Sequence, residues 1–474
     1  MALSPNKPIV CPVLIGRAAD LTALHMLIDQ AKRGMGQVAL MSGEAGIGKS
    51  RLVAEGKTYA LAQGFGLLQG NCFPGDTSCP YAPLLDLLRT HFAGQSRTEI
   101  ATELRPFARE FAQLIPDLVH MLPESAPLPP LPLLEPEQEK RRLFEALTRW
   151  FTGLATKQPV LLIIEDVHWS DDTSLEWLHY LARRCAAHPL LLLVTYRSDE
   201  VLSSLSHWLT QLDRERLTQE FLLARLSRSD LDGMLRAIFA LSRSRQLELP
   251  DLLYTLTEGN PFFVEEILKS LIAAGGIFYE DGTWDRRPLN EMHIPRSLHD
   301  AVQQRTNELS ESARQVLRLA AIAGRRFDFA LLQQLTQHDE QQLLTLMKEL
   351  MAAQFVVEES EERFAFRHAL TREDVYAELL VRERKKLHGT IAETMEQLYA
   401  SAYDAHLAEL AYHFYEAGMW EKALLYTLRA GEKAQSLYSL WAAIEHFTRA
   451  LDAARPSPGE ITLTCDLPST WTSV

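Results

Sequence analysis

Two glycines, a lysine and a serine near the start of the chain have the spacing of a phosphate-binding loop. The stretch follows the pattern G-x-x-x-x-G-K-S and reads Gly43-Glu44-Ala45-Gly46-Ile47-Gly48-Lys49-Ser50, followed by Arg51. Glycines let successive backbone N–H groups turn toward phosphate oxygens, and the N-terminus of a following helix adds its positive dipole end. Lys49 would place its charge near the β- and γ-phosphates, and the Ser50 hydroxyl would ligate Mg²⁺. Because an apolar run precedes this stretch and a helical pattern follows it, we predict a nucleoside triphosphate site formed by residues 43–51.

Two adjacent acids and an arginine end later apolar runs and could complete such a site. Glu165 and Asp166 follow "VLLII", and Arg197 ends "LLLLVTYR". One carboxylate can hold a magnesium-bound water and its neighbour can orient the attacking water. An arginine at this place could reach the γ-phosphate and would lose its partner on hydrolysis. We therefore predict Glu165, Asp166 and Arg197 as catalytic residues, and Ser50, Glu165 and Asp166 as metal ligands.

Five short apolar runs supply the elements that would position these side chains. Each run is about strand length and is bounded by Gly, Pro or polar residues; the runs cover residues 37–43, 65–71, 159–166, 189–197 and 220–226. Their apolarity is continuous rather than alternating, which is typical of strands buried on both faces of a parallel sheet. Helical patterns lie between them. We predict that residues 1–225 form an α/β P-loop nucleotide-binding domain with a parallel sheet, interrupted by a Pro-rich surface loop at residues 123–137.

The next two parts are predicted to be mainly helical. Residues 226–292 form an all-α lid domain in which Asn260 caps a helix that begins at Pro261. Residues 293–400 combine helix starts at Ser297 and Ser312, a helix stop at Gly324 and a hairpin in "QFVVEESEERFAFRH". Helices followed by a hairpin and a further helix indicate a winged-helix-like domain.

The end of the chain carries an internal echo. Ala423-Leu424 recurs as Ala443-Ile444, each followed at the same distance by Arg-Ala, so residues 401–454 are predicted to form TPR-like helical repeats. Residues 455–474 break the helical pattern and are predicted to be an irregular tail. Since a stacked array needs further repeats or a polar capping helix, we expect the chain to be a truncated form of a longer protein.

Composition limits the classes of function. The 474 residues are 47% apolar and 23% charged, with a formal net charge of −14, which argues against broad binding to a nucleic-acid backbone. The five cysteines are scattered and contain no C-x-x-C pair, so neither a zinc site nor a disulfide framework is indicated. The N-terminus lacks the apolar region of a signal peptide, and no apolar run is long enough for a membrane span. We expect a cytoplasmic location.

Taken in order, six segments resemble one family. They read "LIGRAADLTAL", "GEAGIGKSRL", "LLIIEDVHWSDDTSLEWLHYLA", "TYRSDE", "LTEGNPFFVEEIL" and "FRHALTREDVY". This order is similar to that of the STAND signalling ATPases, in particular the bacterial branch fused to LuxR-type helix-turn-helix or nucleotide cyclase domains. The resemblance covers residues 14–452. It implies an adenine nucleotide, ATP or ADP with Mg²⁺, as the cofactor.

The resemblance also implies roles for further residues. Ile15-Gly16-Arg17 matches the segment that lies against adenine, and Pro261 matches the proline that packs on the nucleotide from the lid. His368 matches the histidine with which the winged-helix domain senses the β-phosphate of ADP, although Ala369 follows it where the family has an acid. Many related P-loop enzymes have Asp first in the acidic pair, so whether Glu165 or Asp166 serves the metal stays open, and hydrolysis is expected to be slow.

The leading functional hypothesis is a signal-transduction switch, closed and monomeric with ADP, open and self-associating with ATP. A full flip between two states needs about 10⁴-fold differential affinity, roughly 5.5 kcal/mol. Contacts to the γ-phosphate, contacts made only in the closed state, and a protein or small-molecule effector on the C-terminal helices would supply it. The expected output is transcription, through an output domain not included here.

Two alternative hypotheses remain. An origin-recognition-like DNA-binding ATPase would need a basic recognition helix, but "DEQQLLTLMKELMAA" carries more acids than bases, so direct DNA binding is not expected. A non-hydrolysing scaffold would hold its nucleotide for structural reasons only. Substitution of Lys49 separates this scaffold from the switch, because only the scaffold should unfold without nucleotide.

Overall fold

The computed structural model of the chain describes residues 10–93, 95–115, 135–239, 249–280, 283–288, 294–400 and 403–455. The tail predicted for residues 455–474 lies outside them except for Arg455, and so does the predicted Pro-rich loop except for its end. There the prediction is wrong by two residues, because Pro136 and Glu137 already form the first turn of helix α6. Proline fits this position, since the first helical N–H groups have no intrahelical acceptor.

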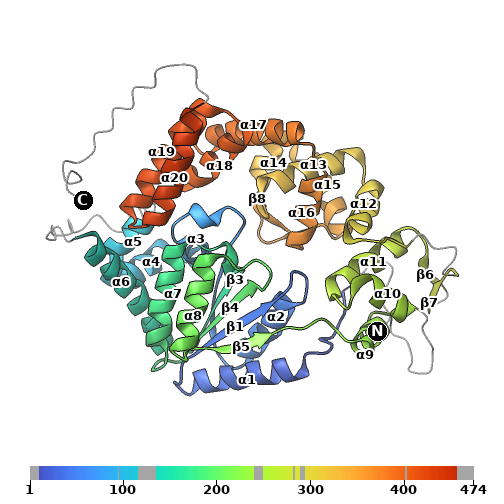
Figure 1. Cartoon of the computed structure of the whole chain (residues 1–474), viewed down its shortest axis with the longest axis horizontal. Coiled ribbons are helices and arrows are strands. Elements are labelled where there is room, and N and C mark those ends of the chain that lie inside the picture. The colour runs from blue at the N-terminus through green and yellow to red at the C-terminus, as the bar shows by residue number, and fades with distance from the viewer. Residues whose placement is uncertain are drawn as a thin grey trace.

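A five-stranded parallel sheet organises the first domain, and all five predicted strands are present (Figure 1). Its order is β2-β3-β4-β1-β5, and the strands are β1 (Gln37–Gly43), β2 (Gly66–Asn71), β3 (Val160–Glu165), β4 (Leu190–Arg197) and β5 (Gln219–Leu222). Strands β3 and β4 are buried along their whole length, as continuous apolarity predicts. The edge strand β5 differs, because only Phe221 of its four residues is buried.

Helices cover both faces of this sheet (Figure 1). Side chains alternate along each central strand: Leu161 and Ile163 pack with the helices of one face, whereas Leu162 and Ile164 pack with those of the other. The first face is covered by α1 (Ala18–Lys32) and α2 (Lys49–Ala62). The second is covered by α3 (Ala82–Phe92), α4 (Arg97–Leu104), α5 (Ala108–Leu114), α6 (Pro136–Lys157), α7 (Asp172–Cys185) and α8 (Ser203–Arg214). The short 3-10 turns η1 (Asp76–Ser78), η2 (Arg105–Phe107) and η4 (Val167–Trp169) connect them.

Parallel pairing brings the predicted site residues together at the carboxyl-terminal ends of the strands. Gly43, the last residue of β1, is in register with Arg197 of β4, and Asn71 of β2 is in register with Glu165 of β3. All these positions are at the carboxyl ends of their strands. Ligands of open α/β sheets bind at this edge.

A helical unit follows the sheet. It contains α9 (Arg228–Phe239), α10 (Leu249–Thr257) and α11 (Pro261–Ala273), with a small hairpin of β6 (Ile277–Glu280) and β7 (Thr283–Arg286). The predicted helix start is confirmed, because the Asn260 side chain caps α11 by accepting from the backbone N–H of Phe262, 3.1 Å away.

Residues 294–400 combine helices with a three-stranded antiparallel sheet of order β8-β10-β9. The elements are α12 (Leu298–Glu308), α13 (Glu311–Ala323), β8 (Arg326–Asp328), α14 (Phe329–Thr336), α15 (Glu340–Ala352), β9 (Val356–Glu358), β10 (Arg363–Phe366), α16 (Ala369–Glu378) and α17 (Val381–Leu398). The predicted hairpin, the Ser297 cap and the Gly324 stop are present. The predicted start at Ser312 is wrong: Ser310 caps α13, because its hydroxyl reaches the N–H of Ala313 three residues on.

The last helices return to the first domain. They are α18 (Leu407–Ala417), α19 (Trp420–Ser436) and α20 (Leu440–Ala454), preceded by the turn η6 (Tyr403–His406). Connections of two and three residues make consecutive helices antiparallel neighbours, with α19 and α20 beside the first domain (Figure 1). Leu437, between them, is buried in the core cluster of the first domain. The Thr173 hydroxyl donates to Ser439 Oγ at 2.8 Å, and His446 Nε2 lies 2.8 Å from the carbonyl of Ser78.

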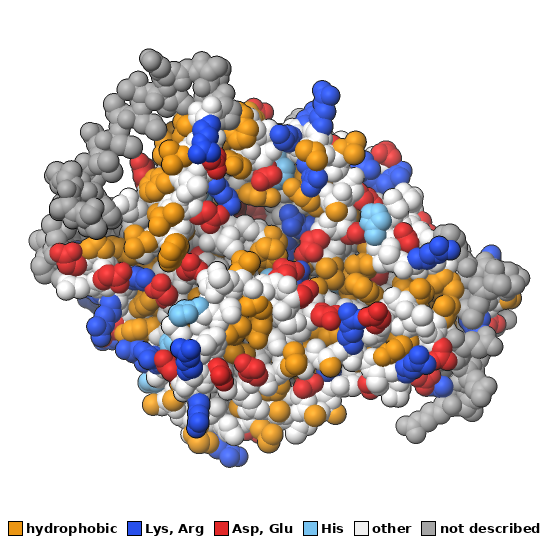
Figure 2. Space-filling view, viewed as in Figure 1, with side chains coloured by type: hydrophobic (Ala, Val, Ile, Leu, Met, Phe, Trp, Pro, Cys, Tyr) orange, Lys and Arg blue, Asp and Glu red, His pale blue; other side chains and the backbone are white. Residues whose placement is uncertain are grey.

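The surface of the described residues carries mixed charge. On the face drawn in Figure 2, Lys and Arg side chains are interspersed with Asp and Glu rather than gathered in one basic patch. Within the described ranges, no helix combines the length and apolar character needed to cross a bilayer.

Candidate nucleotide-binding site

One cavity of about 320 Å³ lies where three parts of the chain meet. The phosphate loop and the first turn of α2 form its floor, the N-terminus of α11 forms one wall, and the junction of β10 with α16 forms another. Eleven of the residues predicted to bind the cofactor line it: Ile15, Arg17, Ala45, Gly46, Ile47, Gly48, Lys49, Ser50, Arg51, Pro261 and His368. The cavity therefore joins segments separated by more than three hundred positions in the sequence.

Three other predicted residues, Gly16, Gly43 and Glu44, are not among the lining residues. The Glu44 carboxylate instead forms an exposed ion pair with Arg225 at 2.9 Å. Gly43 contributes its carbonyl oxygen, which accepts a hydrogen bond from Lys49. At Gly16 (φ +69°), a Cβ would lie 2.9 Å from the Asp230 side chain, so its role is to permit a close approach.

The phosphate loop needs glycine for two different reasons. Gly46 has φ +77°, and a Cβ there would lie 2.7 Å from Cβ of Phe262, so a side chain would push the loop away from α11. Gly48, immediately before α2, has φ +103°, a backbone conformation that residues with a side chain rarely adopt. The N–H groups in the first turn of α2 have no intrahelical acceptors and lie at the positive end of the helix dipole. The loop therefore offers an anion both hydrogen-bond donors and a favourable potential.

Lys49 brings a buried positive charge to the floor of the cavity. Its Nζ donates to the carbonyls of Gly43 at 2.8 Å and Glu44 at 3.0 Å. Burial lowers the pKa of Lys49 to about 8, although Asp166 partly opposes this shift. An ammonium desolvated in this way gains most from an anionic ligand, because neutral carbonyls compensate it only in part.

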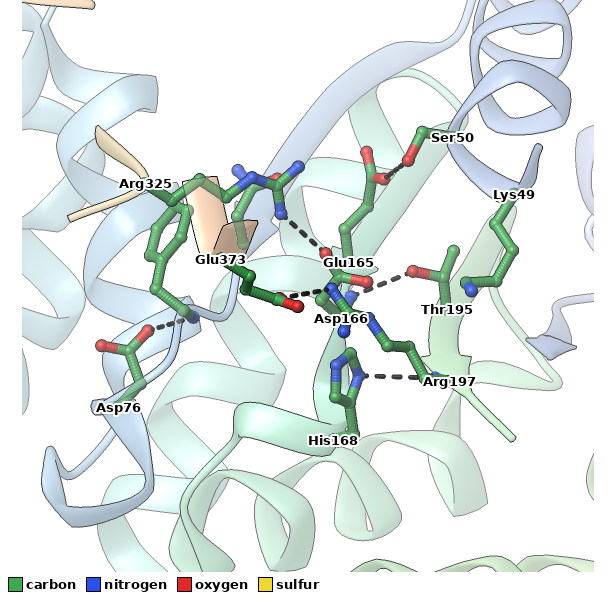
Figure 3. A network of polar contacts seen from close by, with 12 residues as sticks. Lys49, Ser50, Asp76, Glu165, Asp166, His168, Thr195, Arg197, Arg325 and Glu373 are labelled. Carbon is green, nitrogen blue, oxygen red and sulfur yellow. Dashed lines mark hydrogen bonds and ion pairs between the residues drawn. The ribbon is translucent and has the colours of Figure 1, made fainter. Parts of the chain in front are cut away.

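Ser50 and Glu165 lie side by side (Figure 3). The Ser50 hydroxyl donates to Glu165 Oε2 at 2.7 Å, and Gln69 Nε2 donates to Glu165 Oε1 at 2.8 Å. Burial raises the pKa of Glu165, while the Ser50 hydrogen bond acts in the opposite direction. A hydroxyl and a carboxylate in contact are two oxygen donors of the kind that Mg²⁺ prefers. In the described part of the chain, no cluster of three or more His, Cys, Asp or Glu residues could hold a metal by itself.

Asp166 lines the cavity but is paired with another part of the chain. Its backbone is held in the left-handed region (φ +59°), where its N–H donates to Thr195 Oγ1 at 3.0 Å. Its Oδ2 accepts from Arg325 Nη1 at 2.7 Å, and Arg325 comes from the segment just before β8. The two acids of the predicted pair thus have different environments, Glu165 beside Ser50 and Asp166 beside an arginine.

Arg197 is buried and lines the same cavity. Its guanidinium contacts Glu200 through Nη1 and Glu373 of α16 through Nη2, the latter at 3.1 Å (Figure 3). Burial acts to lower the pKa of Arg197, but the carboxylates of Glu373 and Glu200 outweigh it, so the net shift is upward. The backbone N–H of Arg197 donates to His168 Nδ1 at 3.4 Å, and burial lowers the pKa of His168 to about 3, which keeps this imidazole neutral.

An apolar side of the cavity suits a planar base. Among the residues that line the cavity, the apolar side chains include Leu14, Ile15, Leu226, Met234 and Pro261. Arg17 is buried there, with Nη2 donating to the carbonyls of Ile47 at 3.3 Å and of Ala224. This arginine therefore fixes the phosphate loop against the segment after β5 rather than offering a free charge.

His368 and Asn260 connect the walls of the cavity to its floor. The His368 ring lies 4.5 Å from the Phe262 ring, between centroids, and burial lowers the pKa of His368 to about 3. Asn260 Nδ2 donates to the carbonyl of Ala45 at 2.9 Å. A neutral His368 can donate one hydrogen bond to a phosphate oxygen.

Sequence reasoning missed Arg325, Arg367 and Glu265, which also line the cavity. Arg367 Nε is buried and has no hydrogen-bond partner among the described residues, and burial lowers the pKa of this side chain. A buried donor without an acceptor is costly, and an anionic ligand would supply the acceptor. The cationic side chains that line the cavity outnumber Asp166 and Glu265, so the residues present fit a nucleotide with several negative charges.

Comparison with known proteins agrees with this geometry for the first domain. Residues 13–194 match the family model of an AAA ATPase domain. An uncharacterised protein of Rhizobium meliloti (strain 1021) is 28% identical over 460 residues, which are 93% of this chain and 42% of that protein. The chain thus spans less than half the length of this curated relative.

Two solved structures show weaker similarity over most of the chain. A STAND protein with a tetratricopeptide repeat sensor from Pyrococcus horikoshii is 13% identical, with a TM-score of 0.47, and the match covers 95% of this chain and 66% of that one. The ORC1 protein of Aeropyrum pernix in complex with DNA is 15% identical, with a TM-score of 0.33, and the match covers 79% of this chain and 95% of that one.

The family match contains the phosphate loop between β1 and α2, strands β1 to β3 and most of β4, whereas β5 lies beyond its end. Residues 13–194 form an AAA ATPase domain built around a P-loop.

Proposed function

We propose that this chain is a nucleotide-controlled signalling switch of the STAND class. In this proposal ADP holds the closed arrangement described above, and ATP favours an open arrangement that self-associates. The observation that carries the proposal is the single cavity formed by the phosphate loop, the start of α11 and the β10–α16 junction. A ligand that contacts all three parts at once stabilises their closed arrangement by mass action.

Mg²⁺ fits the Ser50 side of the site. We propose that Ser50 and Glu165 hold the ion, because their oxygens are already in contact, whereas Asp166 is paired with Arg325. Bound there, Mg²⁺ would neutralise charge on the phosphate oxygens. Asp166 would then orient the attacking water and Arg197 would stabilise the terminal phosphate, but in the closed state both side chains have other partners. Slow turnover of ATP to ADP and phosphate follows from this competition.

The C-terminal helices are the proposed site of effector control. They reach the first domain through Leu437, Ser439 and His446, so an effector bound to α18–α20 would compete with, or reinforce, this contact. Regulation of transcription through a further output domain belongs to the same proposal.

The candidate recognition helix does not favour direct DNA binding by this chain. The candidate recognition helix α15 and its cap carry Asp339, Glu340 and Glu349 against one base, Lys348. Recognition of a phosphate backbone requires the opposite balance.

The proposal predicts a nucleotide-dependent change in size. With saturating ADP and Mg²⁺ the chain is expected to be a closed monomer. With a saturating non-hydrolysable ATP analogue and Mg²⁺ it is expected to have a larger hydrodynamic radius or a higher mass. Light scattering coupled to size-exclusion chromatography measures both. Because the closed state also makes contacts to the C-terminal helices, the shift is expected to grow when Leu437 is replaced by Asp, which weakens that contact. Identical mass and radius under all these conditions would contradict the proposal.

A further inference from the structure

Arg325 and Glu373, from residues 294–400, form ion pairs with Asp166 and Arg197, the two side chains proposed to act on the terminal phosphate. Arg325 Nη1 lies 2.7 Å from Asp166 Oδ2, and Glu373 Oε1 lies 3.1 Å from Arg197 Nη2 (Figure 3). The signs are opposite in the two pairs: the acid of the first domain receives an arginine, and its arginine receives an acid. The closed arrangement therefore neutralises both side chains without a nucleotide.

The second pair bears directly on the choice between ATP and ADP. Arg197, Lys49 and Asp166 line one cavity, and Arg197 is 5% exposed, so its guanidinium cannot turn outward to bulk solvent without moving the surrounding segments. Its Nη1 is engaged by Glu200 from its own loop, and its Nη2 by Glu373. A γ-phosphate placed within reach of Arg197 would meet the carboxylate of Glu373 at the same guanidinium. Two anions that compete for one cation also repel each other.

We infer that Glu373 is the residue that makes the closed arrangement select a nucleoside diphosphate over a triphosphate. This inference rests on the proposed function. With ADP, the Glu373 carboxylate occupies the place at Arg197 that the missing phosphate leaves available. With ATP, either the γ-phosphate forgoes Arg197 or α16 moves away, so binding of ATP is coupled to separation of α16 from the first domain. Glu373 thus acts as a specificity-determining residue through Arg197.

The effect of Glu373 on nucleotide affinity is expected to be moderate, because its side chain is 38% exposed and solvent screens its charge. We expect a change of about fivefold to tenfold in the ratio of ATP to ADP affinity from this contact. The remaining part of the switch energy would come from other contacts, such as Arg325 with Asp166.

The test is isothermal titration of the full chain with ADP–Mg²⁺ and with a non-hydrolysable ATP analogue plus Mg²⁺. The Glu373→Gln variant keeps the size and hydrogen-bonding ability of the side chain but removes its charge. It is expected to bind the ATP analogue about fivefold to tenfold more tightly relative to ADP than the unmodified chain does. This shift is expected to shrink as the salt concentration rises, because it comes from charge.

Two matched variants separate selection from loosening of the domains. Glu378→Gln removes a carboxylate from the same helix, α16, whose charged neighbours are His299, Asp374 and Arg318 rather than Arg197. Arg326→Gln removes the ion pair with Asp86, which joins the same two parts of the chain at 2.7 Å but outside the cavity lining. Glu378→Gln is expected to leave the affinity ratio unchanged. Arg326→Gln weakens the closed arrangement without touching Arg197, so it is expected to shift the ratio by less than Glu373→Gln does.

An equal shift in Arg326→Gln, or no shift in Glu373→Gln, would overturn the role of Glu373 while leaving the proposed function intact. If the unmodified, folded chain bound neither nucleotide, the proposed function would fail as well.

Discussion

Replacement of Lys49 by Ala is expected to weaken the binding of both ADP and ATP by roughly 30- to 150-fold while the chain stays folded. The loss corresponds to about 2–3 kcal/mol, the upper part of the usual range for a hydrogen bond to a charged group. The fold should tolerate the change, because Lys49 is a buried ammonium whose pKa burial already lowers to about 8 and whose hydrogen bonds go to the carbonyls of Gly43 and Glu44. Removing it therefore removes a desolvation cost together with two hydrogen bonds.

Titration calorimetry and thermal unfolding of Lys49→Ala measure the two quantities separately. Lys57→Ala is a matched control, because Lys57 is on the same helix and its Nζ contacts Gln69 rather than the phosphate loop. This control is expected to bind nucleotide normally. Outright unfolding of Lys49→Ala would instead support the non-hydrolysing scaffold hypothesis, and unchanged affinity would remove Lys49 from the site.

Acid is expected to destabilise the closed chain steeply between pH 6.5 and 5. Five histidines have lowered pKa values mainly because of burial: His168 and His368 to about 3, His388 and His446 to about 4, and His413 well below its usual value. Histidine has an unperturbed pKa of about 6.5, so in this range the unfolded chain binds protons that the folded chain does not. Stability is therefore fully present above pH 6.5 and is lost as the pH falls below it.

The expected loss in the free energy of unfolding is large. Each of the four histidines whose pKa is lowered to about 3 or 4 costs about 1.4 kcal/mol at pH 5.5, so together they cost about 6 kcal/mol, and His413 acts in the same direction. This is comparable with the total stability of a typical domain. His388 and His413 form a direct pair, with 2.8 Å between their Nδ1 atoms. One ring donates its Nδ1–H to the other, so there is no room for a second proton between them. Thermal unfolding at pH 7.5, 6.5 and 5.5 measures the effect, and His388→Gln is expected to reduce its slope. A melting temperature that did not change over this range would contradict these pKa values.

The sequence predicted the parts of the site that are local in the chain. The five strands, the phosphate loop and the ends of β3 and β4 follow from short apolar runs and their neighbours, and parallel pairing then places Gly43, Glu165 and Arg197 at one edge. The apolar edge strand was predicted to be buried on both faces, because composition does not show that β5 has a neighbour on one side only.

The contacts between distant parts could not be predicted in this way. Arg325 lies in the short connection before β8 and Glu373 lies on helix α16, and no sequence spacing distinguishes either of them from an ordinary solvated charge. Their roles come from the packing of residues 294–400 against the first domain, which brings Arg325 to Asp166 across 159 positions and Glu373 to Arg197 across 176 positions. The burial of Leu437 could not be predicted for the same reason, because the side chains that surround it belong to the core of the first domain.

Hydrogen–deuterium exchange of the full chain with and without ADP–Mg²⁺ tests most directly whether one nucleotide holds three parts of the molecule together. ADP is expected to slow exchange in the phosphate loop at residues 44–51, at the start of α11 around residues 261–265, and at the β10–α16 junction around residues 367–370. Protection confined to the phosphate loop, with the other two segments unchanged at saturating ADP, would contradict this expectation.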